Sequence, residues 1–386
     1  MNSTNVKSLV FALLPAAGFV QAQQKPNIVV ILADDLASNE ISCYGGKNLI
    51  TPNIDRIAKE GVRFTNNFAS CTMSVPIRAS LYTGLYPARH GSYQNHKASN
   101  PDIKSVTHYF PEAGYRVGRA GKTHTAPRKV YNFEKIPGFE ENCVSNTANY
   151  TVGGIREFIQ RDNNPFCLFV CSIHPHAPWT WGNQDEFDAD KVILPPNCVD
   201  NQETRKLFRK YLAEIRALDD EVGAVLKVLE ESGKLDNTLV IFLGEQGPQL
   251  PGGKWTCWNF GQNSALAARY PAKIKAKSTS HAIVQYEDIL PTLIEVAGGD
   301  EIAGIDGKSF LKALYGKAKK LVDRYVRRPA IEFYDMEKDP WELNNLAEEK
   351  KYAERISRMK AELQKWMLQQ GDTGADMDIK QEKYAL

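Results

Sequence analysis

The segment "PNIVVILADD" (residues 26–35) decides the fold that this sequence predicts. Its branched apolar side chains form one continuous run, which is typical of a parallel strand that is buried on both faces. Similar runs follow at residues 115–121, 166–173 and 237–244, with helical stretches between them. This alternation of strands and helices predicts an α/β domain in which helices flank a mostly parallel central sheet.

Two helices are well defined in the sequence. Residues 51–61 have Thr51 at the capping position, Pro52 just inside the helix and Gly61 just past its end. A second and much longer helix is expected at residues 203–233. These helices supply the connections that parallel strands need.

Polar side chains follow each of the four strands at its carboxyl end. They are Asp34 and Asp35, Lys122 and His124, His174 and His176, and Glu245 and Gln246. Each pair alone is typical of a turn, a helix cap or a surface loop. Ligands of open α/β sheets, however, bind beyond the carboxyl ends of the strands. The four pairs together therefore predict one site for a metal and an anion.

The chain length and the net charge limit the possible domain organisation and partners. The 386 residues exceed the roughly 250–300 residues at which a single core stops growing. We expect a large domain over residues 23–315 and a small C-terminal subdomain over 316–386. The net charge of +2 gives no reason to expect nucleic acid as a partner, and the short basic run at 316–321 is typical of a solvated surface.

The N-terminus has the order of a secretory signal. Lys7 precedes an apolar run at residues 9–20, and small residues follow at 20–22. The run is too short to span a bilayer, and no cysteine follows it directly, so we expect no membrane anchor. This pattern predicts a signal peptide over residues 1–22 and a secreted or periplasmic protein.

The seven cysteines leave at least one thiol unpaired, and their spacing does not fix any pairing. Cys167 and Cys171 lie in a predicted buried strand, so we expect them to be structural thiols. The sequence has no CxxC pair or His/Cys cluster that would indicate zinc.

The stretch "CTMSVPIRASLYTG" (71–84) raises a separate question. Pro76 suits the first turn of a helix, so Ser74 should lie at a helix N-terminus, where backbone N–H groups favour negative charge. Arg78 follows one turn later and should face the same pocket. Ser74 is therefore either an ordinary N-cap or the centre of an active site.

These motifs resemble the sulfatase family of the alkaline-phosphatase-like superfamily, from residue 26 to residue 349. Sulfatases carry a Cys or Ser followed by x-Pro-x-Arg, which a maturation enzyme oxidises to formylglycine. Ser74 fits this pattern with Pro76 and Arg78. Cys71 does not, because methionine and valine occupy the positions of that proline and arginine. The resemblance implies a formylglycine derived from Ser74 and a serine-type maturation enzyme as a partner.

The resemblance also implies a bound divalent cation. Its ligands would be oxygen atoms, which suit a hard ion, and calcium is the expected one. The implied ligands are Asp34, Asp35, Ser74, Glu245 and Gln246.

The sulfate site and the mechanism follow from the same resemblance. Lys122, Lys254 and His176 would bind the sulfate, and Arg78 would hold the hydrated aldehyde. One hydroxyl of that hydrate would attack sulfur to give a covalent sulfo-enzyme, and the other would then expel sulfate. His124 would drive this elimination by taking a proton, and His176 would protonate the leaving group.

Within the family, the sequence is most similar to the heparan N-sulfatases (sulfamidases). The similar segments are residues 121–134, 245–254 and 366–374. This likeness implies a sulfated saccharide as substrate. We expect the enzyme to cleave sulfate esters or sulfamates, with glucosamine N-sulfate of heparan fragments as one candidate.

The sequence departs from the family pattern in three places. Glu245 and Gln246 replace the usual Asp and Asn or His, so the backbone must lie further from the ion. Ile77 stands where many relatives have a small polar residue. The region between residues 314 and 332 is short where sulfatases carry a strand-rich piece, which predicts a shortened C-terminal subdomain.

Two other functions are compatible with these residues. One is a phosphate or phosphonate ester hydrolase of the same superfamily, which shares the metal site. The other is an inactive relative that binds sulfated glycans, for which the short C-terminal region is the reason. The complete set of acids, lysines and histidines favours an enzyme.

Overall fold

The computed structural model describes residues 25–145, 149–316, 331–339 and 344–370. The expected signal peptide and nearly all of the basic run at 316–321 lie outside these ranges. The chain divides into two compact units, Met1–Thr279 with Ile283–Leu311, and Ser280–Ala282 with Lys312–Leu386.

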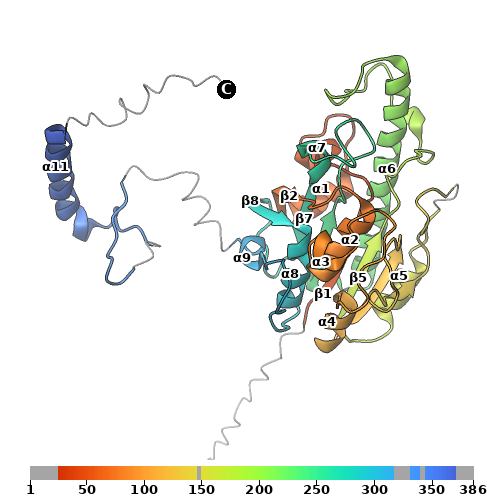
Figure 1. Cartoon of the computed structure of the whole chain (residues 1–386), viewed down its shortest axis with the longest axis horizontal. Coiled ribbons are helices and arrows are strands. Elements are labelled where there is room, and N and C mark those ends of the chain that lie inside the picture. The colour runs from red at the N-terminus through yellow and green to blue at the C-terminus, as the bar shows by residue number, and fades with distance from the viewer. Residues whose placement is uncertain (1–24, 146–148, 317–330, 340–343, 371–386) are drawn as a thin grey trace, which may run out of the picture. The chain divides into compact units, whose positions relative to one another are not determined.

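The first unit is built on an eight-stranded sheet, of which Figure 1 labels β1, β2, β5, β7 and β8. The order of the strands is β4-β3-β5-β1-β6-β7-β2-β8. β1 (Asn27–Leu32) lies between β5 (Phe166–Cys171) and β6 (Thr238–Leu243) and is parallel to both. β3 (Arg116–Gly121) and β4 (Glu134–Ile136) continue the parallel arrangement on one side. The predicted mostly parallel α/β sheet is confirmed.

Three strands on the other side of β6 were not expected from the sequence. β7 (Asn263–Arg269) is antiparallel to β6, and β2 (Val62–Phe68) is antiparallel to β7. β8 (Ser278–Gln285) is the last strand of the sheet. The sheet is therefore mixed, and the polar ends of β1, β3, β5 and β6 all lie at the same edge.

Helices cover the sheet, and all residues of β1, β5 and β6 are buried between them. α6 (Gln202–Glu231) packs against α1 (Pro52–Lys59) and α5 (Gly153–Gln160). α8 (Ile289–Val296) packs against α2 (Ser74–Thr83) and α4 (Val106–Glu112). The shorter helices of this unit include α3 (Pro87–His90) and α7 (Asn259–Gln262). Because helices cover both faces of the sheet, the sequences of β1, β5 and β6 are continuous apolar runs.

The capping of α1 differs from the expectation. Thr51 does occupy the N-cap position, but its side chain accepts no hydrogen bond from the helix. Its hydroxyl instead donates to Asp55 Oδ1 at 3.0 Å. The free N–H groups of Asn53 and Ile54 donate to the Asp219 carboxylate of α6, at 3.1 and 2.9 Å. The cap thus comes from the neighbouring helix, which local sequence cannot reveal.

The described part of the second unit contains α11 (Ala353–Gln370) and a short loop structure before it. Leu346 is buried there, and its N–H donates to the carbonyl of Phe333 at 2.8 Å. The rings of Phe333 and Tyr352 lie 5.5 Å apart. Among the described residues, no helix combines the length and apolar character that a membrane span requires.

Candidate active site

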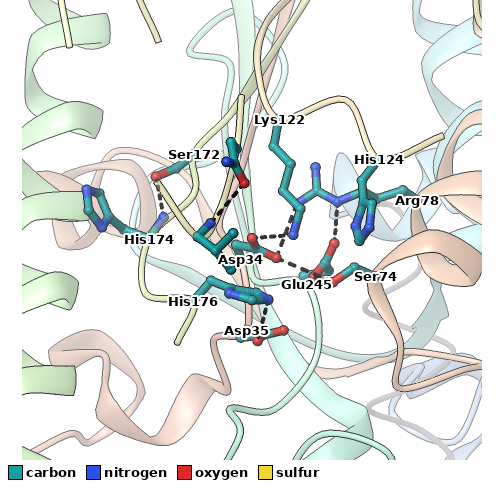
Figure 2. A network of polar contacts seen from close by, with 12 residues as sticks. Asp34, Asp35, Ser74, Arg78, Lys122, His124, Ser172, His174, His176 and Glu245 are labelled. Atoms are coloured by element: carbon teal, nitrogen blue, oxygen red, sulfur yellow. Dashed lines mark hydrogen bonds and ion pairs between the residues drawn. The ribbon is translucent and has the colours of Figure 1, made fainter. Parts of the chain in front are cut away.

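Backbone hydrogen bonds hold the strand ends together at one edge of the sheet. The N–H of Asp34 donates to the carbonyl of His174 at 2.9 Å, which joins the ends of β1 and β5. The N–H of Lys122 donates to the last residue of β5 at 2.9 Å, and that of Ala33 to the last residue of β6 at 2.8 Å. Side chains that follow four different strands are thereby fixed in one place (Figure 2).

Three carboxylates form the centre of the site at this edge of the sheet. Ligand oxygens of Asp34, Asp35 and Glu245 lie within 4.8 Å of one another, and all three residues are fully buried. Buried like charges this close are unfavourable unless cations compensate them.

The cations of Arg78 and Lys122 compensate the first carboxylate. Lys122 Nζ lies 2.5 Å from Asp34 Oδ2, and Arg78 Nη2 lies 3.5 Å from Asp34 Oδ1. Arg78 also forms an ion pair with Glu245 through its Nε. Burial alone would raise the pKa of Asp34, but the charges of Lys122 and Arg78 lower it to about 2. Asp34 is therefore ionised at neutral pH.

Lys254 and His176 lie beside the second carboxylate. Lys254 Nζ is 2.7 Å from Asp35 Oδ2 and 3.2 Å from His176 Nε2. His176 Nε2 itself is 3.5 Å from Asp35 Oδ2. Burial opposes its charged form, yet the hydrogen bond to Cys143 and the charges of Asp34 and Asp35 raise the pKa of His176 to about 9. His176 is thus a proton donor at neutral pH.

Ser74 is the first residue of α2, and its hydroxyl points into the carboxylates (Figure 2). Its Oγ donates to Glu245 Oε2 at 2.7 Å and lies 3.5 Å from Asp34 Oδ1. The N-cap of the helix is Met73, and no side chain caps it. The alternative in which Ser74 is an ordinary N-cap is therefore wrong.

His124 lies near Arg78 in Figure 2. Its Nε2 is 3.1 Å from His96 Nδ1, and its own Nδ1 is buried without a hydrogen-bond partner. Burial, together with the charges of Lys122 and Arg78, lowers the pKa of His124 to about 3. The ring is neutral at physiological pH and can accept a proton.

The loop that carries Glu245 and Gln246 is bracketed by two glycines. A Cβ on Gly244 would lie 2.4 Å from the carbonyl oxygen of Leu36, and one on Gly247 would lie 2.0 Å from that of Phe260. Only glycine permits backbones to approach this closely. These contacts fix the backbone position of Glu245 and Gln246. Because their side chains are longer than the usual Asp and Asn, this backbone has to lie further from the ion.

The donor set fits a hard divalent cation. Gln246 Nε2 donates to Asp35 Oδ1 at 2.5 Å and to Glu245 Oε2 at 3.0 Å, while its Oε1 is buried without a hydrogen-bond partner. An amide oxygen beside three carboxylates and the Ser74 hydroxyl offers only oxygen ligands, which calcium and magnesium prefer.

Comparison with known proteins identifies the family. The family model "Sulfatase" matches residues 26–299. The chain belongs to the sulfatase family. Members of this family are sulfuric ester hydrolases, and so is this protein.

Curated relatives include several sulfatases of sulfated sugars. An ulvan-active sulfatase of Formosa agariphila is 30% identical, over 90% of this chain and 81% of its own length. An N-acetylglucosamine-6-O-sulfatase of Bacteroides thetaiotaomicron is 25% identical, over 92% and 88%. Human N-sulphoglucosamine sulphohydrolase is 27% identical, over 78% and 68%.

Solved structures show the same fold. One protein, in complex with D-glucosamine-2-N,6-O-disulfate, has a TM-score of 0.64 and 22% identity, and the match covers 93% of this chain and 100% of that one. A phosphonate monoester hydrolase of Agrobacterium radiobacter has a TM-score of 0.66 and 19% identity, with coverage of 89% and 96%. This sulfatase therefore has the alkaline-phosphatase-like fold.

Apart from His174, the structure brings together the residues that the sequence singled out, and it adds two more. Cys143 Sγ lies within 4.8 Å of ligand atoms of Asp34 and His176, and His96 Nδ1 lies 3.1 Å from His124 Nε2. Neither residue belongs to a motif or follows a strand, so no sequence pattern pointed to them. His174 does not join the site, because its ring points away and contacts Glu214 Oε2 at 3.2 Å (Figure 2).

All seven cysteines of this sulfatase are free thiols. Cys167 and Cys171 are buried in β5, as expected for structural thiols. Cys71 is half-buried, and burial raises the pKa of its thiol, so it is a poor nucleophile.

Proposed function

We propose that this sulfatase is exported and removes sulfate from a sugar of a sulfated polysaccharide, using a formylglycine derived from Ser74 and one calcium ion. The position of the Ser74 hydroxyl between the carboxylates of Asp34 and Glu245, beside the Arg78 that pairs with Glu245, carries the proposal. A serine in an ordinary structural role has no need of three charged neighbours in the core.

Two kinds of sulfated sugar have support. The likeness of residues 121–134 to heparan N-sulfatases and the 27% identity to human N-sulphoglucosamine sulphohydrolase favour a glucosamine N-sulfate. The 30% identity to an ulvan-active sulfatase favours an O-sulfate ester. Both substrates present the same tetrahedral sulfate to the site.

The charges of the site suit a sulfate that binds together with a cation. The carboxylates of Asp34, Asp35 and Glu245 pair with the cations Arg78, Lys122 and Lys254. A divalent cation adds positive charge to this set, and an anionic sulfate offsets it. Lys122 and Lys254, which contact the carboxylates through single ammonium groups, are the side chains that would bind the sulfate oxygens.

Two histidines would handle the protons. His176, which is protonated at neutral pH, would donate to the oxygen or nitrogen that leaves with the sugar. His124, which is neutral, would accept a proton from residue 74. Arg78, paired with Glu245, would hold residue 74 in position. Once oxidised and hydrated, residue 74 supplies two hydroxyls, one to attack sulfur and one to expel sulfate.

Asp34, Asp35, Glu245 and Gln246 would hold the calcium ion beside residue 74. When bound, the ion supplies positive charge next to the sulfate oxygens and the attacking hydroxyl. The chain's own part is to keep these ligands buried and fixed in place.

The test of the proposal is the chemical state of residue 74. Co-expression with a serine-type maturation enzyme should give active protein whose Ser74 peptide is two hydrogens lighter by mass spectrometry. Ser74→Ala should abolish turnover, and Cys71→Ser, the matched control three residues earlier, should keep most of it. A fully active enzyme with plain serine at position 74 would overturn the mechanism.

A substrate panel decides between the remaining alternatives. Turnover of glucosamine N-sulfate, a glucosamine 6-O-sulfate and ulvan oligosaccharides separates sulfamate from ester cleavage. An aryl phosphonate tests the second function, for which the fold of the phosphonate monoester hydrolase is the reason. Binding of sulfated glycans without turnover of the fully oxidised protein would indicate the inactive relative.

A further inference from the structure

Trp255 lies at the rim of the active site with its ring largely exposed. It follows Lys254 directly, and the centroid of its indole ring is 5.5 Å from Lys254 Nζ. The same Nζ contacts Asp35 and His176 inside the site. The Trp255 side chain nevertheless remains 56% exposed. A large apolar ring therefore borders the charged site.

The backbone holds Trp255 in an unfavourable conformation. Its φ is +67°, in the left-handed region that bulky side chains rarely adopt. The N–H of Trp255 donates to the carbonyl of Thr72 at 3.0 Å, and Thr72 Oγ1 donates to the carbonyl of Thr256 at 2.9 Å. Thr72 lies two residues before Ser74. These bonds fasten the tryptophan loop to the segment that leads into the nucleophile, and strain held in this way is typical of functional positions.

Internal hydrogen bonds hold the loop around Trp255 in place. Thr256 Oγ1 donates to the carbonyls of Gly252 and Gly253, at 2.9 and 2.8 Å. A Cβ on Gly253 would lie 2.1 Å from the carbonyl oxygen of Pro248, so the turn closes tightly on itself. The ring is thus presented by a preformed loop, and little conformational freedom would be lost on binding.

We propose that Trp255 is a stacking platform for a pyranose ring of the substrate, next to the ring whose sulfate enters the site. The inference rests on the proposed saccharide substrate. A pyranose exposes a face of C–H groups, which packs well on an aromatic ring, while its hydroxyls stay in water. An unsulfated ring of the substrate thereby contributes to binding, and the enzyme prefers oligosaccharides to monosaccharides.

Trp255→Gly tests the platform. Glycine suits φ of +67°, so this change removes the ring and relieves the backbone. The measurement is kcat/KM for a sulfated monosaccharide and for a tetrasaccharide with the same sulfated end. We expect the preference for the tetrasaccharide to fall about tenfold, which corresponds to one good aromatic contact. Trp255→Phe should recover part of it.

Trp258→Ala is the matched control. Trp258 lies three residues further along the same loop, is 66% exposed, and has its ring beside Gly252. This change should leave the preference for the tetrasaccharide as it is. An unchanged preference in Trp255→Gly, or an equal fall in Trp258→Ala, would overturn the platform.

A binding measurement separates this inference from the proposed reaction. If the oxidised enzyme turns over no sulfated sugar, the proposed function fails, but the platform remains testable by titration with an unsulfated oligosaccharide of the same chain. Quenching of tryptophan fluorescence that Trp255→Gly abolishes supports the platform. Equal quenching in the wild-type protein and in Trp255→Gly contradicts it.

Discussion

Arg78 pairs with two of the three buried carboxylates of the site. It is fully buried and pairs with both Asp34 and Glu245. Arg78→Ala would leave two buried carboxylates without this partner, so we expect it to lower the free energy of unfolding by about 3–5 kcal/mol. Urea denaturation monitored by circular dichroism measures this loss.

Arg56 provides the control for that prediction. It pairs with Glu60 and Glu230, but these side chains are about one-third exposed or more. Because water already solvates such pairs, Arg56→Ala should cost less than about 1 kcal/mol. If both arginine variants lose the same small amount, the buried network does not carry the stability that its geometry indicates.

His90 makes the stability of the fold depend on pH. The residue is fully buried in α3; its Nδ1 accepts the N–H of Ser92 at 3.1 Å, and burial lowers its pKa to about 4. The unfolded chain takes up this proton near its ordinary pKa of about 6.5, whereas the folded protein does not. Stability should therefore fall as the pH drops from about 6.5 to about 4, by about 2 kcal/mol at about pH 5.

The variant His90→Asn isolates this contribution, because asparagine keeps an acceptor for the Ser92 N–H and takes up no proton. The free energy of unfolding is measured against pH for both proteins. The difference between them should shrink by about 2 kcal/mol between about pH 7 and pH 5. Parallel curves would show that His90 does not titrate differently in the folded and unfolded states.

Residues of the site were predictable where they follow a strand or a motif. Ser74 and Arg78 were found through a local pattern, and Asp34 through its place after an apolar run. His96 and Cys143 reach the site from loops whose path depends on tertiary packing. Hydrophobic periodicity and motif spacing do not predict such a path, so only the structure identifies these two residues.

Among the elements, the central parallel strands were predicted, and the antiparallel strands β7 and β2 were not. β1, β5 and β6 are continuous apolar runs, since helices cover both of their faces. β7 has the sequence "NSALAAR", whose small side chains have low strand preference, and β2 contains polar residues in "VRFTNNF". Both strands form because neighbouring strands supply partners for their backbone hydrogen bonds. The composition of a segment does not predict such partners.

The loop after β6 should tolerate no added side chain at its glycines. Gly247→Ala would place a Cβ 2.0 Å from the backbone oxygen of Phe260, so the loop must move. We expect a loss of about 1–3 kcal/mol in the free energy of unfolding and weaker calcium binding, since Glu245 and Gln246 move too. Isothermal titration with calcium and urea denaturation measure the two effects.

Gly153→Ala at the start of α5 is the control for the loop. No atom lies within 4 Å of the added Cβ there, and helices favour alanine over glycine. This variant should be neutral or slightly more stable, with unchanged calcium affinity. If Gly247→Ala behaves like Gly153→Ala, the close approach at Phe260 does not position the metal ligands.

At the scale of the whole molecule, the fold brings oxygen atoms from separate segments together at a site that suits a divalent cation. We expect a chelator to inactivate the enzyme, and calcium to restore activity better than zinc, because all ligand atoms are oxygens. Asp35→Asn should cost more activity than stability, since it removes charge from a preformed site. Turnover before and after metal removal, with the metal content determined by mass spectrometry, tests this.

One result would contradict the role of the ion. Full turnover in excess chelator, once the protein is shown to be free of metal, would mean that the lysines and arginine alone stabilise the reaction. Better recovery with zinc than with calcium would instead point to a softer ligand, for which Cys143, within 4.8 Å of ligand atoms of Asp34 and His176, is the nearest source.

Helix α2 is buried along its entire length, from Ser74 to Thr83. No enzyme can reach Ser74, Pro76 or Arg78 once this helix has docked, so the proposed oxidation has to precede folding. Oxidation and folding then compete for each newly made chain, and the modified fraction is set by the ratio of their rates. Slower folding should give more modified chains. Protein that is purified in the folded, unmodified form should remain plain serine by mass spectrometry, however long it is incubated with the maturation enzyme.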